Sequence, residues 1–164
     1  MKKNKGFSLV ELIIVIAIMA ILAAAIAPAL IRYIDKSRKA DDVTAAGTIA
    51  TAANAALANE AAYESVQNSM NGTFCIAEGV PGQAFTKKTV ATNDTGTKFV
   101  DELNKNLTGN VAPKLKYKKS LENASTVTPT NWYVYISKDV PMVYVGNSDT
   151  SKVQLSPSIF EDYQ

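Results

Sequence analysis

The chain has 164 residues, of which 47% are apolar and 20% are charged. This is the size of one domain with an additional segment, and the composition excludes wholesale disorder and collagen-like repeats. Three of the 17 basic residues precede Gly6, which leaves 14 against 15 acidic residues, so the overall charge does not indicate nucleic-acid binding. There is no histidine and a single cysteine, Cys75, which excludes Ser-His-Asp and Cys-His catalytic systems, histidine-bearing zinc sites and an intramolecular disulfide. We therefore expect neither an enzyme nor a bound cofactor, and we expect Cys75 to be a buried apolar residue.

The longest apolar stretch lies near the N-terminus. Residues 12–31 contain no charge, and as a helix they would span about 30 Å, the thickness of the hydrocarbon core of a bilayer. A short lysine-rich start precedes this run, and a charge-dense stretch follows it. The pattern predicts a transmembrane helix, and two simpler interpretations are a cleaved secretory signal peptide and a plain membrane anchor.

Glu11 lies immediately before the apolar run, and its charge argues against a plain membrane anchor. A charged side chain costs on the order of 2.5–3.5 kcal/mol at the centre of a membrane helix and less near the interface, so an inert anchor gains nothing from it. Cleavage between Gly6 and Phe7 would create a free α-amine four residues before Glu11. We expect that amine to pair with Glu11 of a neighbouring copy, where burial strengthens the attraction between the two charges.

The run Gly-Phe-Ser-Leu-Val-Glu-Leu at residues 6–12, after a short basic leader and before an apolar helix, resembles the class III signal of type IV pilins. The resemblance implies that residues 1–6 are a leader peptide, and that a prepilin peptidase cuts after Gly6 and methylates the new N-terminal Phe7. It also implies that Glu11 acts in assembly by meeting the N-terminus of an adjacent subunit. Pro28 matches the helix-bending proline of many pilins, and its missing N–H and crowded ring favour a kink.

The chain departs from the pilin pattern in three places. Ser8 stands where a threonine is common, Ala20 stands where many pilins have glycine, and a C-terminal cysteine pair is missing. The resemblance covers only about the first thirty residues, because the rest of the chain is too variable in this family for a match to be informative.

For the whole protein, the resemblance implies a structural subunit of a type IV pilus, a homo-oligomeric surface filament of the adhesion and motility class. Its precursor would be a single-pass protein of the cytoplasmic membrane, and its partners would be the prepilin peptidase, an assembly ATPase and a membrane platform, with nucleic acid not expected. The alternative is a pseudopilin of a type II secretion or competence DNA-uptake machine, which shares the N-terminal motif. Secretion pseudopilins often carry a calcium loop near the C-terminus, and residues 146–149 are too sparse in acids to form one. A membrane-anchored enzyme or binding module is the third hypothesis, and no spacing of polar residues proposes a site for it.

The middle of the chain predicts a helical continuation and then a connection. We expect residues 7–31 to be the membrane or filament-core part of one helix over residues 8–68, and residues 32–68 to be its amphipathic part. The apolar stripe of that part contains Val43, Ala46, Ala50, Ala53, Leu57 and Ala61, whereas Asp42 and other polar residues fall off it. Asn71-Gly72 provides a stop, and residues 69–112 are expected to form a connection with one short helix around residues 99–107.

Residues 113–164 carry the strand signals. Alternating or β-branched runs at residues 114–118, 132–136, 142–145 and 152–155 predict an antiparallel sheet of about four strands, packed on the amphipathic helix with Trp132, Val134 and Ile136 on one buried face. The fold class predicted is therefore α+β. Lys114, Lys116, Lys118 and Lys119 are interpreted as a solvated face that blunts an edge strand, with binding of DNA, a host surface or an acidic patch of another subunit as the alternative.

Overall fold

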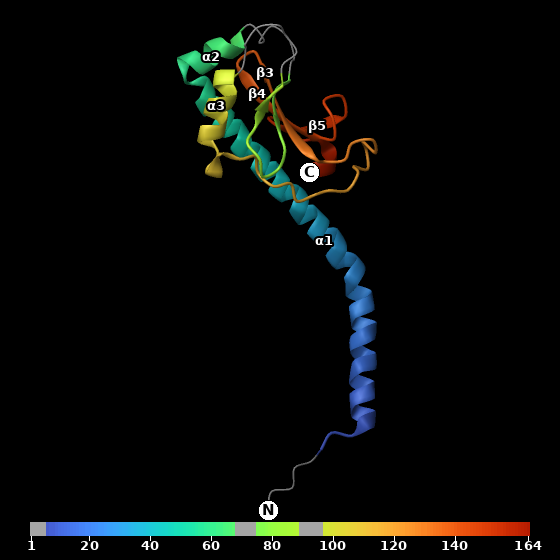
Figure 1. Ribbon diagram of the computed structural model, residues 1–164. Helices are drawn as coiled ribbons and strands as arrows, with labels where there is room; N and C mark the ends of the chain where they lie inside the picture. Colours follow the sequence, from blue (N-terminus) through green and yellow to red (C-terminus); the bar gives the residue numbers. More distant parts are fainter. Residues whose placement is uncertain (1–5, 68–74, 89–96) are drawn as a thin grey trace, which may run out of the picture. The chain divides into compact units, whose positions relative to one another are not determined.

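A computed structural model describes residues 6–67, 75–88 and 97–164 (Figure 1). The chain divides into two units, Met1–Ser37 and Arg38–Gln164. The first unit holds the N-terminal part of helix α1 (Leu9–Leu57), and the second holds the rest of α1 together with every other element. The leader residues before Gly6 and the Asn71-Gly72 pair lie outside the described residues. The α+β class is as predicted.

The helix expected over residues 8–68 is interrupted. α1 ends at Leu57, and a second helix, α2 (Glu60–Gln67), follows after two residues. Asn59 explains the break, because its side-chain oxygen accepts the backbone N–H of Ala62 at 3.2 Å and so caps the new helix. The prediction of one continuous helix is therefore wrong in its last part.

The second unit contains a five-stranded sheet that is antiparallel throughout, with the strand order β2-β1-β3-β4-β5. The sequence predicted about four strands, and the last three of these are confirmed as β3 (Asn131–Ser137), β4 (Val140–Gly146) and β5 (Lys152–Ser156). The stretch expected to be a connection contributes two strands, β1 (Cys75–Gly79) and β2 (Thr86–Lys87). It also contains the short helix that was predicted there, α3 (Thr97–Asn106). The described residues also contain two 3-10 helices, η1 (Thr108–Asn110) and η2 (Glu161–Tyr163).

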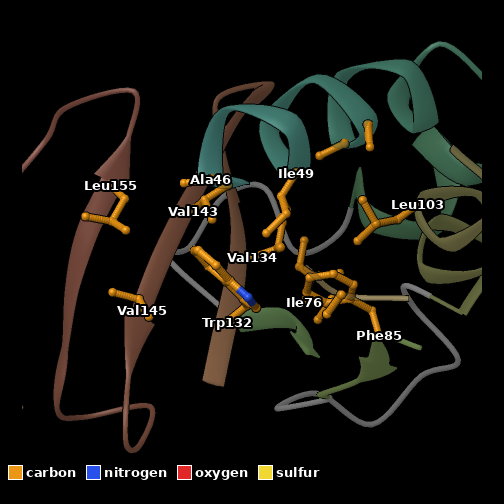
Figure 2. Close-up of a cluster of buried hydrophobic side chains, with 14 of the residues drawn as sticks. Ala46, Ile49, Ile76, Phe85, Leu103, Trp132, Val134, Val143, Val145 and Leu155 are labelled. Atoms are coloured by element: carbon orange, nitrogen blue, oxygen red, sulfur yellow. The ribbon is translucent and has the colours of Figure 1, made fainter. Parts of the chain in front are cut away.

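The core lies between α1 and one face of the sheet. Trp132, Val134 and Ile136 are buried in one cluster with the side chains of α1, as predicted, and Figure 2 shows Ala46 and Ile49 of the helix beside the valines of the strands. The helix contributes mainly alanines to this contact, and small side chains let the helix and sheet backbones approach closely. Successive strand residues alternate between faces, so the opposite face of the sheet carries a smaller buried cluster of Cys75, Tyr133 and Tyr135.

The predicted stripe on α1 is right in part. Ala46 and Ala53 are fully buried as expected, whereas Ala61 is exposed, and Ile49 and Ala56 also lie at the centre of the contact. The stripe was shifted because it was chosen among alanines, whose small side chains carry little information about which face is covered.

Asp42 is the main correction to the sequence-based interpretation. It was placed off the apolar stripe, but its side chain is fully buried. Its two carboxylate oxygens accept the backbone N–H groups of Lys116 and Tyr117 at 2.8 and 3.0 Å. The strand predicted over residues 114–118 is therefore wrong: exposed lysines and buried apolar residues do alternate there, but a helix carboxylate takes the place of a neighbouring strand.

Two more side chains hold the irregular stretch that connects η1 to β3. The indole N–H of Trp132 donates to the carbonyl of Pro113 at 2.8 Å. The carboxylate of Asp162, in η2, accepts the backbone N–H of Asn123 at 3.0 Å and its side-chain amide at 2.6 Å. A connection of this length lacks ladder hydrogen bonds, so these contacts supply partners for its polar backbone groups.

Asp42→Ala should lower the free energy of unfolding by about 3 kcal/mol, because it leaves two buried N–H groups without a protein partner. The measurement is denaturant unfolding of the full-length protein in detergent micelles, followed by the fluorescence of Trp132, the single tryptophan. Tyr163→Phe is the matched control, since its hydroxyl is a buried polar atom with no partner among the described residues. That variant should be as stable as wild type or more stable by about 1 kcal/mol. Wild-type stability of Asp42→Ala would contradict the clamping role.

Wild type and Asp42→Ala should also differ in how the free energy of unfolding depends on pH. Burial raises the pKa of Asp42 above its usual value, against the opposing effect of the two backbone N–H bonds. A carboxyl whose pKa rises on folding binds more protons in the folded state, so its contribution to the free energy of unfolding falls as pH increases from its ordinary pKa through the raised one. This part of the pH dependence should be present in wild type and missing in Asp42→Ala.

Candidate processing and assembly site

The N-terminal end of α1 is closed by a capping box. Ser8 precedes the helix, and its hydroxyl oxygen accepts the N–H of Val10 at 3.3 Å, while its carbonyl accepts the N–H of Leu12 at 3.2 Å. In return, the carboxylate of Glu11 accepts the N–H of Ser8 at 2.8 Å. These bonds satisfy donors that would otherwise lack a partner at a helix start. The helix therefore begins at a fixed residue, next to the expected cleavage point.

The Gly6–Phe7 bond lies outside the helix. The Phe7 side chain is 87% exposed, and nothing lies within 4 Å of the position that a side chain on Gly6 would occupy. Because α1 begins at Leu9, a peptidase can reach this bond without unwinding the helix.

Glu11 has a neutral partner in this state of the chain. It is the acidic residue of the first turn of α1, where the partial positive charge of the helix N-terminus favours a carboxylate. Cleavage after Gly6 would place an ammonium group on Phe7, directly before Ser8. A charged donor makes a stronger hydrogen bond to a carboxylate than a backbone N–H does. The geometry therefore lets Glu11 exchange one donor for a better one.

Pro28 lies inside α1 and is not part of this first-turn site. It follows Glu11 by 17 residues, or about 26 Å of helix. As a proline it cannot donate the backbone hydrogen bond to the carbonyl of Ala24. The kink expected at Pro28 stays a prediction.

The N-terminal part of α1 exposes its apolar side chains. Those with the largest exposed fractions include Leu9, Met19, Ile21, Ile26 and Tyr33, each at least 60% exposed. Among the described residues, α1 is the one helix long and apolar enough to cross a membrane. An apolar surface of this extent marks a region that contacts lipid or another protein.

Outside this first-turn site, the one thiol of the chain is that of Cys75. Burial raises the pKa of the Cys75 thiol to about 12, so it is not a thiolate at neutral pH. The described residues contain no group of three or more His, Cys, Asp or Glu side chains placed to hold a metal ion. Cys75 is buried, as predicted.

Residues 1–27 match the family model described as the prokaryotic N-terminal methylation motif. The chain carries the class III signal of type IV pilins and pseudopilins. This signal indicates a structural, pilin-like subunit rather than an enzyme, made as a membrane-anchored precursor, processed by a prepilin peptidase and assembled into filaments. No solved structure matches the chain. The matched residues include Gly6, Phe7 and Glu11 and end immediately before Pro28.

The capping role of Ser8 and Glu11 was missed at the level of sequence, although the signal is present. Ser-x-x-Glu before an apolar run is the pattern of a capping box. From the sequence, Glu11 was expected only to meet the N-terminus of a second subunit. The structure gives the same carboxylate a partner within its own chain.

Ser8→Ala should fray the first turn of α1. Loss of a serine cap costs typically about 1 kcal/mol, which corresponds to roughly five-fold faster amide hydrogen exchange at Val10. The measurement is hydrogen exchange of the full-length protein in detergent micelles, with Ser8→Thr as the control that keeps the hydroxyl. Unchanged protection of Val10 in Ser8→Ala would contradict the capping box.

Proposed function

We propose that this protein is a structural subunit of a type IV pilus. In this proposal the prepilin peptidase cuts between Gly6 and Phe7 and methylates Phe7, and the mature subunit then polymerises through α1 into a surface filament. The observation that carries the proposal is the combination of the class III signal with an apolar helix whose side chains are exposed among the described residues. Lipid covers this surface before assembly, and copies of the same helix cover it in the filament core.

Glu11 gives the polymer its register. In the precursor its carboxylate is held by the N–H of Ser8. Within the filament core it would be a buried charge, which is costly unless an opposite charge meets it. The amine of Phe7 of an adjacent subunit supplies that charge, so only the arrangement that brings the two groups together is stable.

One contact favours a pilus subunit over a secretion pseudopilin. The turn between β4 and β5 is the place where a calcium loop would lie, and Asp149 is the acidic residue of residues 146–149 in that turn. Its carboxylate accepts the hydroxyl of Tyr135 and pairs with the ammonium group of Lys152 at 3.2 Å. A carboxylate engaged by these two donors is not arranged for a cation, and the calcium loop of secretion pseudopilins therefore has no counterpart in this turn.

Glu11→Gln should abolish most filament assembly and leave processing intact. The glutamine keeps an oxygen that can accept the N–H of Ser8, so the helix start is preserved while the charge is lost. We expect at least a ten-fold loss of the protein from sheared surface filaments, with a normal mature N-terminus in the membrane fraction. Ser8→Ala is the matched control, because it weakens the cap and keeps the carboxylate, and it should assemble. Normal filaments from Glu11→Gln would contradict the pairing with Phe7.

Gly6→Leu should block cleavage. A large side chain at the residue before the cut would leave the uncleaved precursor in the membrane and no subunit in the sheared fraction. The measurement is the intact mass of the membrane-bound protein. A mature mass identical to that of wild type would show that the cleavage site is assigned to the wrong bond.

A further inference from the structure

The residues 114–119, here called the lysine segment, present a row of cations on a fixed backbone. Lys114, Lys116 and Lys118 are exposed, and the residues between them, Leu115 and Tyr117, are buried. Because exposed lysines alternate with buried residues, the three lysine side chains leave the molecule on the same side. The Asp42 carboxylate fixes this backbone through two N–H bonds. The row is therefore a preformed surface and not a flexible tail.

Three of the four lysines in the lysine segment lack a salt bridge within the described part of the molecule. Lys114, Lys116 and Lys118 form no ion pair with the described residues. Lys114 and Lys118 line a hollow of about 670 Å³ whose remaining walls are proline, leucine and threonine. Lys39 of α1 adds a further cation beside the row, 4.9 Å above the ring of Tyr117.

Helix α2 presents the complementary charge. Its sequence contains Glu60 and Glu64 and no basic residue. Both side chains are exposed, and they form no ion pair with the described residues. Residues four apart on a helix lie on one face about 6 Å apart. Two like charges at this spacing repel each other, and a pair of cations would relieve that repulsion.

The two surfaces cannot meet within one chain. The lysine segment is bonded to α1 at Asp42, and α2 begins beyond the end of α1 at Leu57, about 22 Å further along the helix. A lysine side chain reaches only about a third of this distance.

We propose that the lysine segment of one subunit docks on Glu60 and Glu64 of α2 of a second copy along the filament. The inference rests on the proposed function, because a filament is what places many copies side by side. The two surfaces lie at different places on the same unit, so the contact is head-to-tail and repeats without closing into a dimer. Single-stranded nucleic acid fits less well, because the aromatic residues at the row, Tyr117 and Trp132, are buried and offer no stacking surface.

Carbodiimide cross-linking of wild-type filaments tests the contact directly. This reagent joins a lysine to a carboxylate only where the two are in contact. Filaments are sheared separately from nitrogen-15-labelled and unlabelled cells, dissociated, mixed and reassembled before cross-linking. Peptides that join one labelled and one unlabelled partner then come from two copies of the chain. We expect mixed-label peptides that join Lys114, Lys116 or Lys118 to Glu60 or Glu64. Joined peptides from these lysines to any other carboxylate alone would overturn the proposal.

A charge swap tests the same contact independently. Lys116→Glu with Lys118→Glu, and separately Glu60→Lys with Glu64→Lys, should each lower the sheared filament fraction at least five-fold with normal processing. The combination of all four changes should return it to within two-fold of wild type. Lys138→Glu, at an exposed residue of the β3–β4 turn, is the control for a lost surface charge and should assemble normally.

The outcomes separate this proposal from the proposed function. Absence of wild-type filaments would refute the pilus assignment itself. Wild-type filaments together with fully assembling charge-reversed variants would refute only the docking contact. Failure of the Lys116→Glu, Lys118→Glu variant to assemble, without rescue by Glu60→Lys and Glu64→Lys, would also overturn the docking contact. That outcome would indicate a partner other than a second copy, such as an anionic membrane or nucleic acid.

Discussion

The structure depends on the apolar surface of the N-terminal part of α1, whose side chains are exposed within the described unit. The side chains at the beginning of α1 are more than half exposed at nearly every large apolar residue, which no isolated protein in water can sustain. Lipid or another protein must cover this surface. The single acidic residue of the first turn, Glu11, then acquires a specific meaning, because a carboxylate in such surroundings must find a donor. Its bond to Ser8 satisfies it in this structure, and in the proposed filament an amine of another subunit satisfies it after cleavage.

The second half of α1 has a different environment. Ala46, Ala53 and Ala56 make a smooth surface against which the sheet packs, and they bury little area each, so the core depends on Trp132 and the strand valines for most of its apolar contacts. Asp42 is the exception in this surface. Its buried carboxylate accepts two backbone N–H groups of the lysine segment and so fixes a set of exposed lysines on the surface of the molecule. Asp42 therefore links the core of the second unit to the position of the exposed lysines.

The sequence predicted those features whose residues are neighbours in the chain. The N-terminal motif could be recognised because its residues, from Gly6 to Glu11, are neighbours in the chain, whereas the roles of these residues in cleavage and assembly stay predictions. The strands β3, β4 and β5 could be predicted from aromatic and β-branched residues that alternate. β1 was missed because Cys-Ile-Ala-Glu-Gly is short and has low strand propensity, and it becomes a strand only between β2 and β3. The alternation of residues 114–118 correctly indicated which side chains are exposed, but a strand also needs a neighbour, and here Asp42 occupies that place. A buried carboxylate on a helix, paired with backbone 74 residues later, leaves no local pattern that could have revealed it.

The measurement that tests the central claim most directly is the N-terminal sequence and intact mass of the protein in material sheared from cells. The account predicts an abundant chain that begins at N-methylated Phe7 and has lost the residues before it. The same mature end found only in the membrane fraction would contradict the pilus assignment and favour a pseudopilin. A chain that begins near Pro28, or one that still carries Met1, would contradict both the assigned cleavage site and the pilin interpretation.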